Sequence, residues 1–244
     1  MPNKRHPILT IGGFDPSGGA GVLADIKTFE QHRLLGMAVN TANTVQSEDE
    51  FLSVNWLDKS LILEQLDQLL KHYQFNYVKI GLIPSIDFIH ELHSKLGNAK
   101  IIWDPILTAS AGFDMQHDFS SLQDVLKKVD FFTPNWEEIK SLSGKDDAIA
   151  AAEDFAKLCN VYLKGGHDTE HPGRDHVFFN GKHFHLKAKG KKITPKHGSG
   201  CVLSSALAAN LSLRYPKHKA CLKAKSYVTR VLESNPSLLG QHNR

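Results

Sequence analysis

The sequence predicts an α/β fold in which helices cover both faces of a mostly parallel sheet. Short apolar runs rich in β-branched and aromatic residues alternate along the chain with longer segments of helical period. The apolar runs have no polar face, which is typical of parallel strands that are buried on both sides. Strand followed by helix, repeated several times, gives a parallel sheet covered by helices.

Five segments are predicted as buried strands, and most of them end at Gly, Asp or Thr. In open α/β sheets, ligands bind beyond the carboxyl ends of such strands, so polar residues that follow them are candidates for a site. The predicted strands span 7–12, 76–81, 100–104, 129–133 and 160–166.

Three segments between these strands are predicted as amphipathic helices. In the first, apolar residues recur every three or four positions from Ile62 to Tyr73, and Asp58 is a suitable N-cap. In the second, Ser85 can cap the start and Gly97 can end the helix. The predicted helices span 58–73, 85–96 and 147–158.

One antiparallel hairpin is predicted at an edge of the sheet, over residues 176–187. Asn180 and Gly181 separate two β-rich runs there, and Asn-Gly is the strongest short signal for a two-residue hairpin turn. The acidic run 47–50 is expected to be a solvated loop. No internal repeat or long linker divides the chain, so residues 1–244 are expected to form one domain.

Composition and charge restrict the classes of partner. The 244 residues are 41% hydrophobic, and 29 basic against 26 acidic residues give a net charge of +3. No Lys- or Arg-rich stretch is interleaved with aromatic residues, so no nucleic-acid partner is expected. The first apolar run is too short for a signal or membrane segment. Three cysteines without paired spacing favour a reducing compartment, so we expect a cytoplasmic protein.

A glycine-rich turn before a small-residue apolar segment is the first candidate site. Gly198, Ser199, Gly200 and Cys201 would lie at the start of a buried helix, where free N–H groups and the helix dipole favour an anion such as a phosphoryl group. The same field would lower the pKa of Cys201, which could then act as a base or nucleophile. A thiol buried in the core is the alternative.

A second glycine cluster, residues 12–29, follows the first predicted strand. Its spacing matches neither the dinucleotide G-x-G-x-x-G pattern nor a phosphate-binding loop with Gly-Lys-Ser/Thr. The segment could be a flexible turn. It could also be a pocket wall where small residues admit a flat ligand, with Asp25 offering a carboxylate one turn into the following helix.

Oxygen ligands follow two of the later strands. Asp104 ends one strand, and Asn135 and Glu138 are three residues apart where a helix can begin. Such donors suit a hydrated Mg²⁺, although helix capping would also explain them. His167 and His171 are four residues apart, but proline and glycine follow at once, so no helical zinc site is expected there.

Seven short segments, taken together in chain order, carry a resemblance to a known family. The segments are GGFDPSGGAGVLADIKTF (12–29), TVQ (44–46), KIG (79–81), DPIL (104–107), TPNWEE (133–138), LKGGH (163–167) and HGSGC (197–201). The set resembles the hydroxymethylpyrimidine and phosphomethylpyrimidine kinases of thiamine synthesis, which belong to the ribokinase-like superfamily.

This resemblance implies a three-layer α/β/α sandwich and ATP-dependent phosphorylation of the hydroxymethyl group of 4-amino-5-hydroxymethyl-2-methylpyrimidine, then of its monophosphate. It also implies ATP, Mg²⁺ and a homodimer. Gly198, Ser199 and Gly200 would form the anion hole for the transferring phosphoryl group. Cys201 would help to deprotonate the substrate hydroxyl, and Lys164 would contact the nucleotide.

The remaining family roles fall on the substrate and on Mg²⁺. Gln46 and Asp25 would hydrogen-bond the pyrimidine, and Gly13 would leave room for its ring. In the family's N-x-x-E motif, Asn135 and Glu138 would hold Mg²⁺ and phosphate through water. Asp104 would lie beside them as a second carboxylate for the metal.

Three positions depart from the family pattern: Phe14 replaces serine, Leu82 replaces methionine, and Lys196 replaces threonine. These changes leave two alternatives open. The first is a pyridoxal kinase, since pyridoxal is a similarly flat ring. The second is a non-catalytic pyrimidine or nucleotide sensor that keeps the pocket without the chemistry.

Overall fold

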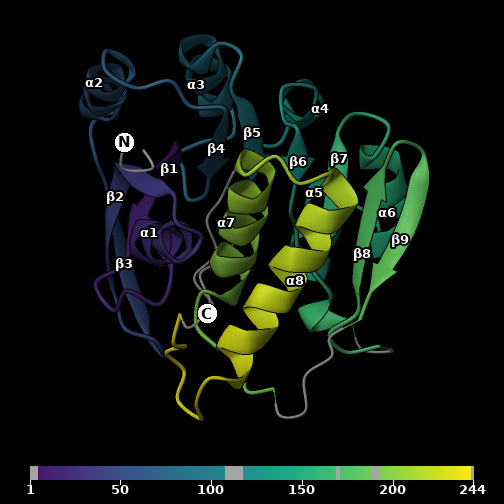
Figure 1. Cartoon of the computed structure of the whole chain (residues 1–244). Helices are drawn as coiled ribbons and strands as arrows, with labels where there is room; N and C mark the ends of the chain where they lie inside the picture. The colour runs from purple at the N-terminus through teal and green to yellow at the C-terminus, as the bar shows by residue number, and fades with distance from the viewer. Residues whose placement is uncertain (1–4, 108–117, 169–170, 188–192, 243–244) are drawn as a thin grey trace.

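The computed structural model describes residues 5–107, 118–168, 171–187 and 193–242, which fold into three layers with a sheet between two sets of helices (Figure 1). The strands are β1 (Pro7–Phe14), β2 (Leu35–Gln46), β3 (Phe51–Trp56), β4 (Tyr77–Ile80), β5 (Lys100–Trp103), β6 (Phe131–Phe132), β7 (Asn160–Leu163), β8 (Asp175–Phe179) and β9 (Lys182–Leu186). The helices are α1 (Gly21–Gln31), α2 (Lys59–Leu70), α3 (Phe88–Leu96), α4 (Leu122–Leu126), α5 (Trp136–Ser143), α6 (Ala148–Phe155), α7 (Ser199–Ser212) and α8 (Lys217–Glu233), with a short 3₁₀ turn at Gly165–His167.

The strands form one sheet in the order β3-β2-β1-β4-β5-β6-β7-β8-β9. The six central strands, β2-β1-β4-β5-β6-β7, are parallel to one another, and β3, β8 and β9 pair antiparallel at the edges. The predicted hairpin is confirmed as β8–β9. Asn180 (φ 52°) and Gly181 (φ 67°) both adopt the left-handed conformation that a tight two-residue turn of this kind requires.

A second antiparallel pair, β2–β3, lies at the opposite edge and was not expected from the sequence. The acidic run 47–50 connects the two strands, where the Ser47 N–H donates to the Glu50 carbonyl. β2 contains glycine and two asparagines, Asn40 and Asn43, which are poor strand formers. Pairing with β1 on one side and β3 on the other outweighs that local preference.

The three predicted helices are confirmed as α2, α3 and α6, with shorter ends. Asp58 takes the N-cap position of α2 but makes no side-chain cap, whereas Asp147 caps α6 by accepting from two backbone N–H groups. The N-cap of α3 is Asp87 rather than Ser85. Gly97 ends that helix as predicted, with φ 59°.

Two hydrophobic layers lie on either side of the sheet. α1, α7 and α8 cover one face and α2 to α6 the other, as Figure 1 shows. Neighbouring strand residues point to opposite layers: Tyr162 packs with α7 and α8, while Val161 and Leu163 pack on the other side. Helix α7 is buried from Cys201 to Ser212. None of the described helices is both long and apolar enough to cross a membrane.

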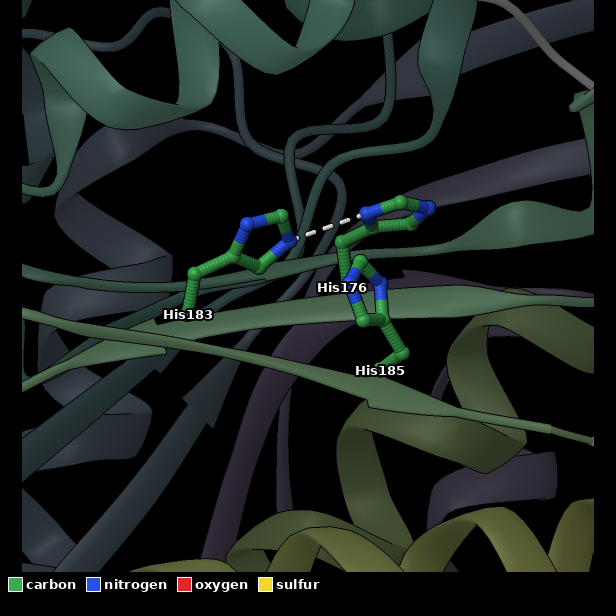
Figure 2. Close-up of side chains that lie close together, drawn as sticks. All are labelled: His176, His183 and His185. Carbon is green, nitrogen blue, oxygen red and sulfur yellow. Dashed lines mark hydrogen bonds between the residues drawn. The ribbon is translucent and has the colours of Figure 1, made fainter.

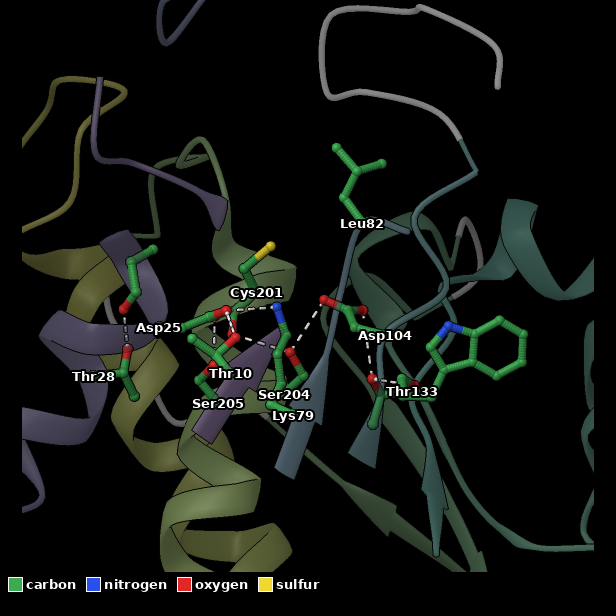
Figure 3. Close-up of polar contacts among 12 residues, drawn as sticks. Thr10, Asp25, Thr28, Lys79, Leu82, Asp104, Thr133, Cys201, Ser204 and Ser205 are labelled. Atoms are coloured by element: carbon green, nitrogen blue, oxygen red, sulfur yellow. Dashed lines mark hydrogen bonds and ion pairs between the residues drawn. The ribbon is translucent and has the colours of Figure 1, made fainter. Parts of the chain in front are cut away.

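A fully buried ion pair links α1 to the centre of the sheet (Figure 3). The Lys79 ammonium on β4 lies 2.9 Å from a carboxylate oxygen of Asp25, and that oxygen also accepts from Thr10 on β1. The second oxygen accepts from Ser205 on α7 at 2.5 Å. Burial alone would lower the pKa of Lys79, but the negative charge of Asp25 raises it, so Lys79 stays protonated.

This pair generates a prediction for stability. Lys79→Met should lower the free energy of unfolding by about 3–5 kcal/mol, because it leaves Asp25 buried without its counter-charge. The matched control is Lys95→Met, which removes an ammonium from the partly exposed pair with Asp67 and should cost at most ~1 kcal/mol. Urea unfolding measures both values. Equal losses in the two variants would contradict the role of the buried pair.

Candidate active site

Two glycine-rich loops meet at the carboxyl edge of the sheet, where α7 begins. Gly198, the N-cap of α7, adopts φ 68°, and a β-carbon there would lie 2.1 Å from the carbonyl oxygen of Gly19. A side chain at Gly198 would therefore push the two loops apart. The His197 ring joins them, because its Nε2 lies 2.9 Å from the Asp15 carboxylate.

Asp15 organises the first of these loops. Its carboxylate accepts from the backbone N–H groups of Ser17 and Ala20, at 2.9 and 2.7 Å, and from the Ser17 hydroxyl. Burial would raise the pKa of Asp15, but the hydrogen bonds from His197, Ala20 and Ser17 lower it. The loop is thus a folded support for the start of α7, and the expected alternative of a flexible turn does not apply.

Cys201 lies in the first turn of α7, where its sulfur meets the first glycine loop. The side chain is buried, and burial raises the pKa of the thiol to about 12. The Lys79 ammonium and the backbone N–H of Gly21 act in the opposite direction but do not outweigh burial. The prediction of a lowered pKa was therefore wrong: in this structure Cys201 is a neutral thiol at physiological pH.

An ammonium group lies beside the same helix start. A β-carbon on Gly200 would be 3.2 Å from the Lys164 Nζ, so this glycine lets the ammonium approach the first turn of α7. Lys164 Nζ also lies 2.6 Å from Asp104 and 3.5 Å from Glu138. Burial would lower the pKa of Lys164, but the two carboxylates raise it. The candidate residues Gly198, Gly200, Cys201, Lys164, Asp104 and Glu138 are thus brought together.

Asn135 and Glu138 form a capping box at the start of α5. The Asn135 side chain accepts from the Glu138 N–H at 2.8 Å, and the Glu138 carboxylate accepts from the Asn135 N–H at 2.6 Å. Burial raises the pKa of Glu138 to about 7, Lys164 opposes that rise, and the Asp104 charge adds to it. The capping alternative is therefore confirmed, and the Glu138 carboxylate also lies 3.5 Å from the ammonium of Lys164.

Asp104 is held from three sides. Its carboxylate accepts from Lys164 at 2.6 Å. It also accepts from Ser204 on α7 at 3.1 Å and from Thr133 at 3.4 Å (Figure 3). Burial would raise its pKa, but the ammonium groups of Lys164 and Lys79 lower it. Lys79, Thr133 and Ser204 were given no role from the sequence, because nothing in a linear pattern distinguishes buried polar groups that meet only in three dimensions.

The candidate pyrimidine-binding residues divide between two places. Gly13 packs against Leu82, since a β-carbon there would lie 2.7 Å from the Leu82 side chain. Gln46, at the end of β2, donates to Thr44, which in turn donates to the carbonyl of Phe14. Figure 3 shows the side chains of Leu82 and Cys201 above the buried network. Gly13, Leu82 and Cys201 are buried, and Gln46 is partly exposed.

Asp25 lies below the sheet edge instead. It is fully buried, and its oxygens already accept from Thr10, Lys79 and Ser205. The expectation that Asp25 hydrogen-bonds a pyrimidine does not fit this position, because no face of the carboxylate reaches the surface. Its observed contacts make it the counter-charge of Lys79.

Only part of the segment around His167 and His171 is described by the structure. Gly165–His167 forms a single 3₁₀ turn, and residues 169–170 lie outside the described residues. Within the turn, Gly165 is required, since a β-carbon would lie 1.7 Å from the Arg174 carbonyl oxygen. This turn follows Lys164 directly and holds the end of β7 against β8.

The arrangement as a whole is suited to binding a phosphoryl group. The first turn of α7 carries the positive end of the helix dipole, and the Ser199 N–H in that turn donates to the Lys196 carbonyl at 3.3 Å. Lys164 adds a full positive charge beside it, and the buried carboxylates hold that ammonium in place. A hydroxyl brought near the Cys201 thiol would therefore meet a phosphoryl group whose charge is stabilised.

Comparisons with known proteins agree with this chemistry. The family model described as phosphomethylpyrimidine kinase matches residues 15–244. A hydroxymethylpyrimidine/phosphomethylpyrimidine kinase of Saccharomyces cerevisiae is 33% identical over 93% of this chain, which spans 46% of that relative's length. The enzyme of the same name from Aquifex aeolicus is 32% identical, over 94% of this chain and 95% of its own length.

Solved structures give the same fold. A phosphomethylpyrimidine kinase from Clostridium difficile is 28% identical with a TM-score of 0.76, over 92% of this chain and 98% of the other. An ADP complex of a Bacillus subtilis pyridoxal kinase is 25% identical with a TM-score of 0.80, over 93% and 92% of the two chains. The predicted ribokinase-like sandwich is thereby confirmed.

The contact between the glycine loops generates a prediction. Gly198→Ala should destabilise the protein through its left-handed backbone, by about 1–2 kcal/mol, and through overpacking against Gly19, by a further ~1–3 kcal/mol. Gly144→Ala is the control, because Gly144 has nearly the same φ of 66° but no atom within 4 Å of a β-carbon. Denaturant unfolding compares the two. A loss no larger in Gly198→Ala would show that the loops can separate without cost.

Proposed function

Because the chain belongs to the phosphomethylpyrimidine kinase family, we propose that it phosphorylates 4-amino-5-hydroxymethyl-2-methylpyrimidine, and then its monophosphate, at the expense of ATP. The product is the pyrimidine diphosphate used in thiamine synthesis. The chain spans about half the length of the first yeast relative it matches, so the proposal concerns the kinase unit alone.

One observation carries this proposal: Lys164 and the start of α7 converge, with Cys201 in the same helical turn. In the proposed step the hydroxymethyl oxygen attacks the γ-phosphorus of ATP. The bond to the β–γ bridging oxygen breaks, and ADP leaves. The N–H groups of Gly198, Ser199 and Gly200 would stabilise the charge on the transferring group, and Lys164 would neutralise charge on the nucleotide.

Cys201 is the proposed acceptor of the hydroxyl proton. Its thiol has a pKa of about 12 because it is buried, so only a small fraction is ionised at neutral pH. The Lys79 ammonium and the Gly21 N–H both stabilise that thiolate fraction. In phosphoryl transfer the bond to the leaving oxygen is largely broken before the bond to the attacking hydroxyl oxygen forms. A base that is ionised in only a small fraction of molecules, but is aligned with the hydroxyl, is therefore sufficient.

The residues at the site fit a hydrated Mg²⁺. Two carboxylates, Asp104 and Glu138, share one ammonium, Lys164, which leaves them with an excess negative charge. Burial raises the pKa of Glu138 to about 7, and the negative charge of Asp104 adds to that rise. We propose that Glu138 and Asn135 hold the ion through water beside Asp104; when bound, Mg²⁺ neutralises charge on the ATP phosphates.

For the pyrimidine we propose a place on the open side of Gly13 and Leu82, with Gln46 as the amide that hydrogen-bonds the ring. The Gln46 amide N–H donates to the Thr44 hydroxyl in this structure. A ligand would either replace Thr44 as the partner of this amide or bind to its remaining donor and acceptor atoms. A β-carbon on Gly13 would lie 2.7 Å from the Leu82 side chain, so Leu82 fills this space in the structure and would have to move for a ring to lie beside the Gly13 backbone.

Three further properties are proposed for the whole chain. Residues 1–244 act as one kinase domain, supported by the single sheet that runs through the described residues. The cytoplasm is its location, supported by three free cysteines. It forms a homodimer, supported by large apolar side chains exposed on β2 and β3, namely Val45, Leu52 and Trp56.

A product assay tests the function. The purified chain is incubated with Mg-ATP and, in separate tubes, the hydroxymethylpyrimidine, its monophosphate, or pyridoxal, and products are identified by mass. We expect monophosphate and diphosphate from the pyrimidine series. Phosphate on pyridoxal alone would support the pyridoxal kinase alternative, and binding of the pyrimidine without turnover would support the sensor.

The role of Cys201 gives a separate prediction. Cys201→Ala should lower the single-turnover rate by about two orders of magnitude or more. Since the pKa of the Cys201 thiol lies near 12, the thiolate fraction grows with pH, and the wild-type rate should rise up to ~10-fold per pH unit above neutrality. The Cys201→Ala variant should not show this rise. Cys159→Ala is the control, because burial also raises the pKa of that thiol to about 12, away from the site. An undiminished rate in Cys201→Ala would exclude it as the base.

A further inference from the structure

Three histidines gather on the edge hairpin β8–β9, outside the site described above. His176 lies on β8 and pairs directly with His185 on β9, while His183 is two residues away on the same strand and therefore on the same face. Figure 2 shows the three rings turned toward one another. One nitrogen from each ring lies within 4.8 Å of the others.

We propose that His176, His183 and His185 bind a transition-metal ion, with Zn²⁺ as the expected occupant. Three imidazole nitrogens with an open fourth position are a common Zn²⁺ donor set. Imidazole is a poor ligand for Mg²⁺, which prefers oxygen donors. This site is thus chemically distinct from the carboxylates that suit Mg²⁺ at the start of α7.

The distances favour this occupant. His176 Nδ1 and His183 Nε2 are 3.0 Å apart and share a hydrogen bond. Two nitrogens bound tetrahedrally to one Zn²⁺ at 2.0–2.1 Å would be roughly 3.3 Å apart, so the ion could replace the shared proton with a small movement. His183 and His185 are exposed on an edge strand. Their rings can therefore move so that the nitrogen of His185 also comes within bonding distance of the ion.

The surroundings of His176 fit a metal ligand as well. Its Nε2 lies 3.9 Å from the Asp168 carboxylate, beyond hydrogen-bond distance but close enough for the charge to act on the ring, while Nδ1 faces His183. The Trp136 ring meets it edge-on at 5.9 Å and limits its motion.

The binding test uses the full chain and a matched pair of variants. Equilibrium dialysis against Zn²⁺, in the presence of excess Mg²⁺, should give about one bound Zn²⁺ per chain. The double variant His183→Gln, His185→Gln should weaken that binding by at least ~10-fold. The control is His72→Gln, His218→Gln, which removes two exposed histidines from other elements and should leave it unchanged.

A second measurement tests the coordination geometry of the bound ion. Co²⁺ bound to three imidazoles should give intense visible absorption typical of tetrahedral coordination, and this should disappear in the hairpin variant only. Both altered residues are exposed, so the metal-free variants should unfold at the same temperature as the wild type. No saturable binding, or the same binding in the hairpin and control variants, would overturn the proposal.

Discussion

The buried ion pair between Asp25 and Lys79 is the constraint on which the rest of the structure depends. Neither charge reaches water, so each must be satisfied by the protein, and the partners that do this come from separate elements. Thr10 brings β1 and Ser205 brings α7 to the same carboxylate. Helix α7 is therefore docked by polar contacts, from Ser205 to Asp25 and from Ser204 to Asp104, in a largely apolar layer, and these set where its first turn can lie.

The electrostatics of the site follow from that placement. Lys79 lies behind the first turn of α7 and Lys164 beside it, so two ammonium groups act on one small region. Asp25, Asp104 and Glu138 balance them and hold the side chains still. A phosphoryl group would enter an environment whose charges are already oriented, which is the arrangement that lowers a charged transition state most effectively.

Some of this could be predicted from the sequence. Strand runs, the Asn-Gly turn and the glycines before α7 are local signals, and the structure confirms the elements they indicate. Helix α8 was missed although Ala220, Ala224, Tyr227 and Val231 mark a clear apolar stripe of helical period. The state of the Cys201 thiol could not be predicted, because burial by the first glycine loop outweighs the helix dipole. The protonation state of this thiol depends on packing between segments that are far apart in the sequence.

The contacts that build the phosphate site join residues far apart in the chain. Asp15 and His197 are separated by 182 positions, Asp25 and Ser205 by 180, and Asp104 and Ser204 by 100. During synthesis the strands and their first glycine loop emerge long before α7 does. The proposed cradle for phosphate would therefore be completed late, after the rest of the sheet can fold, and a ribosome-bound chain that ends before α7 would lack the residues proposed to bind phosphate.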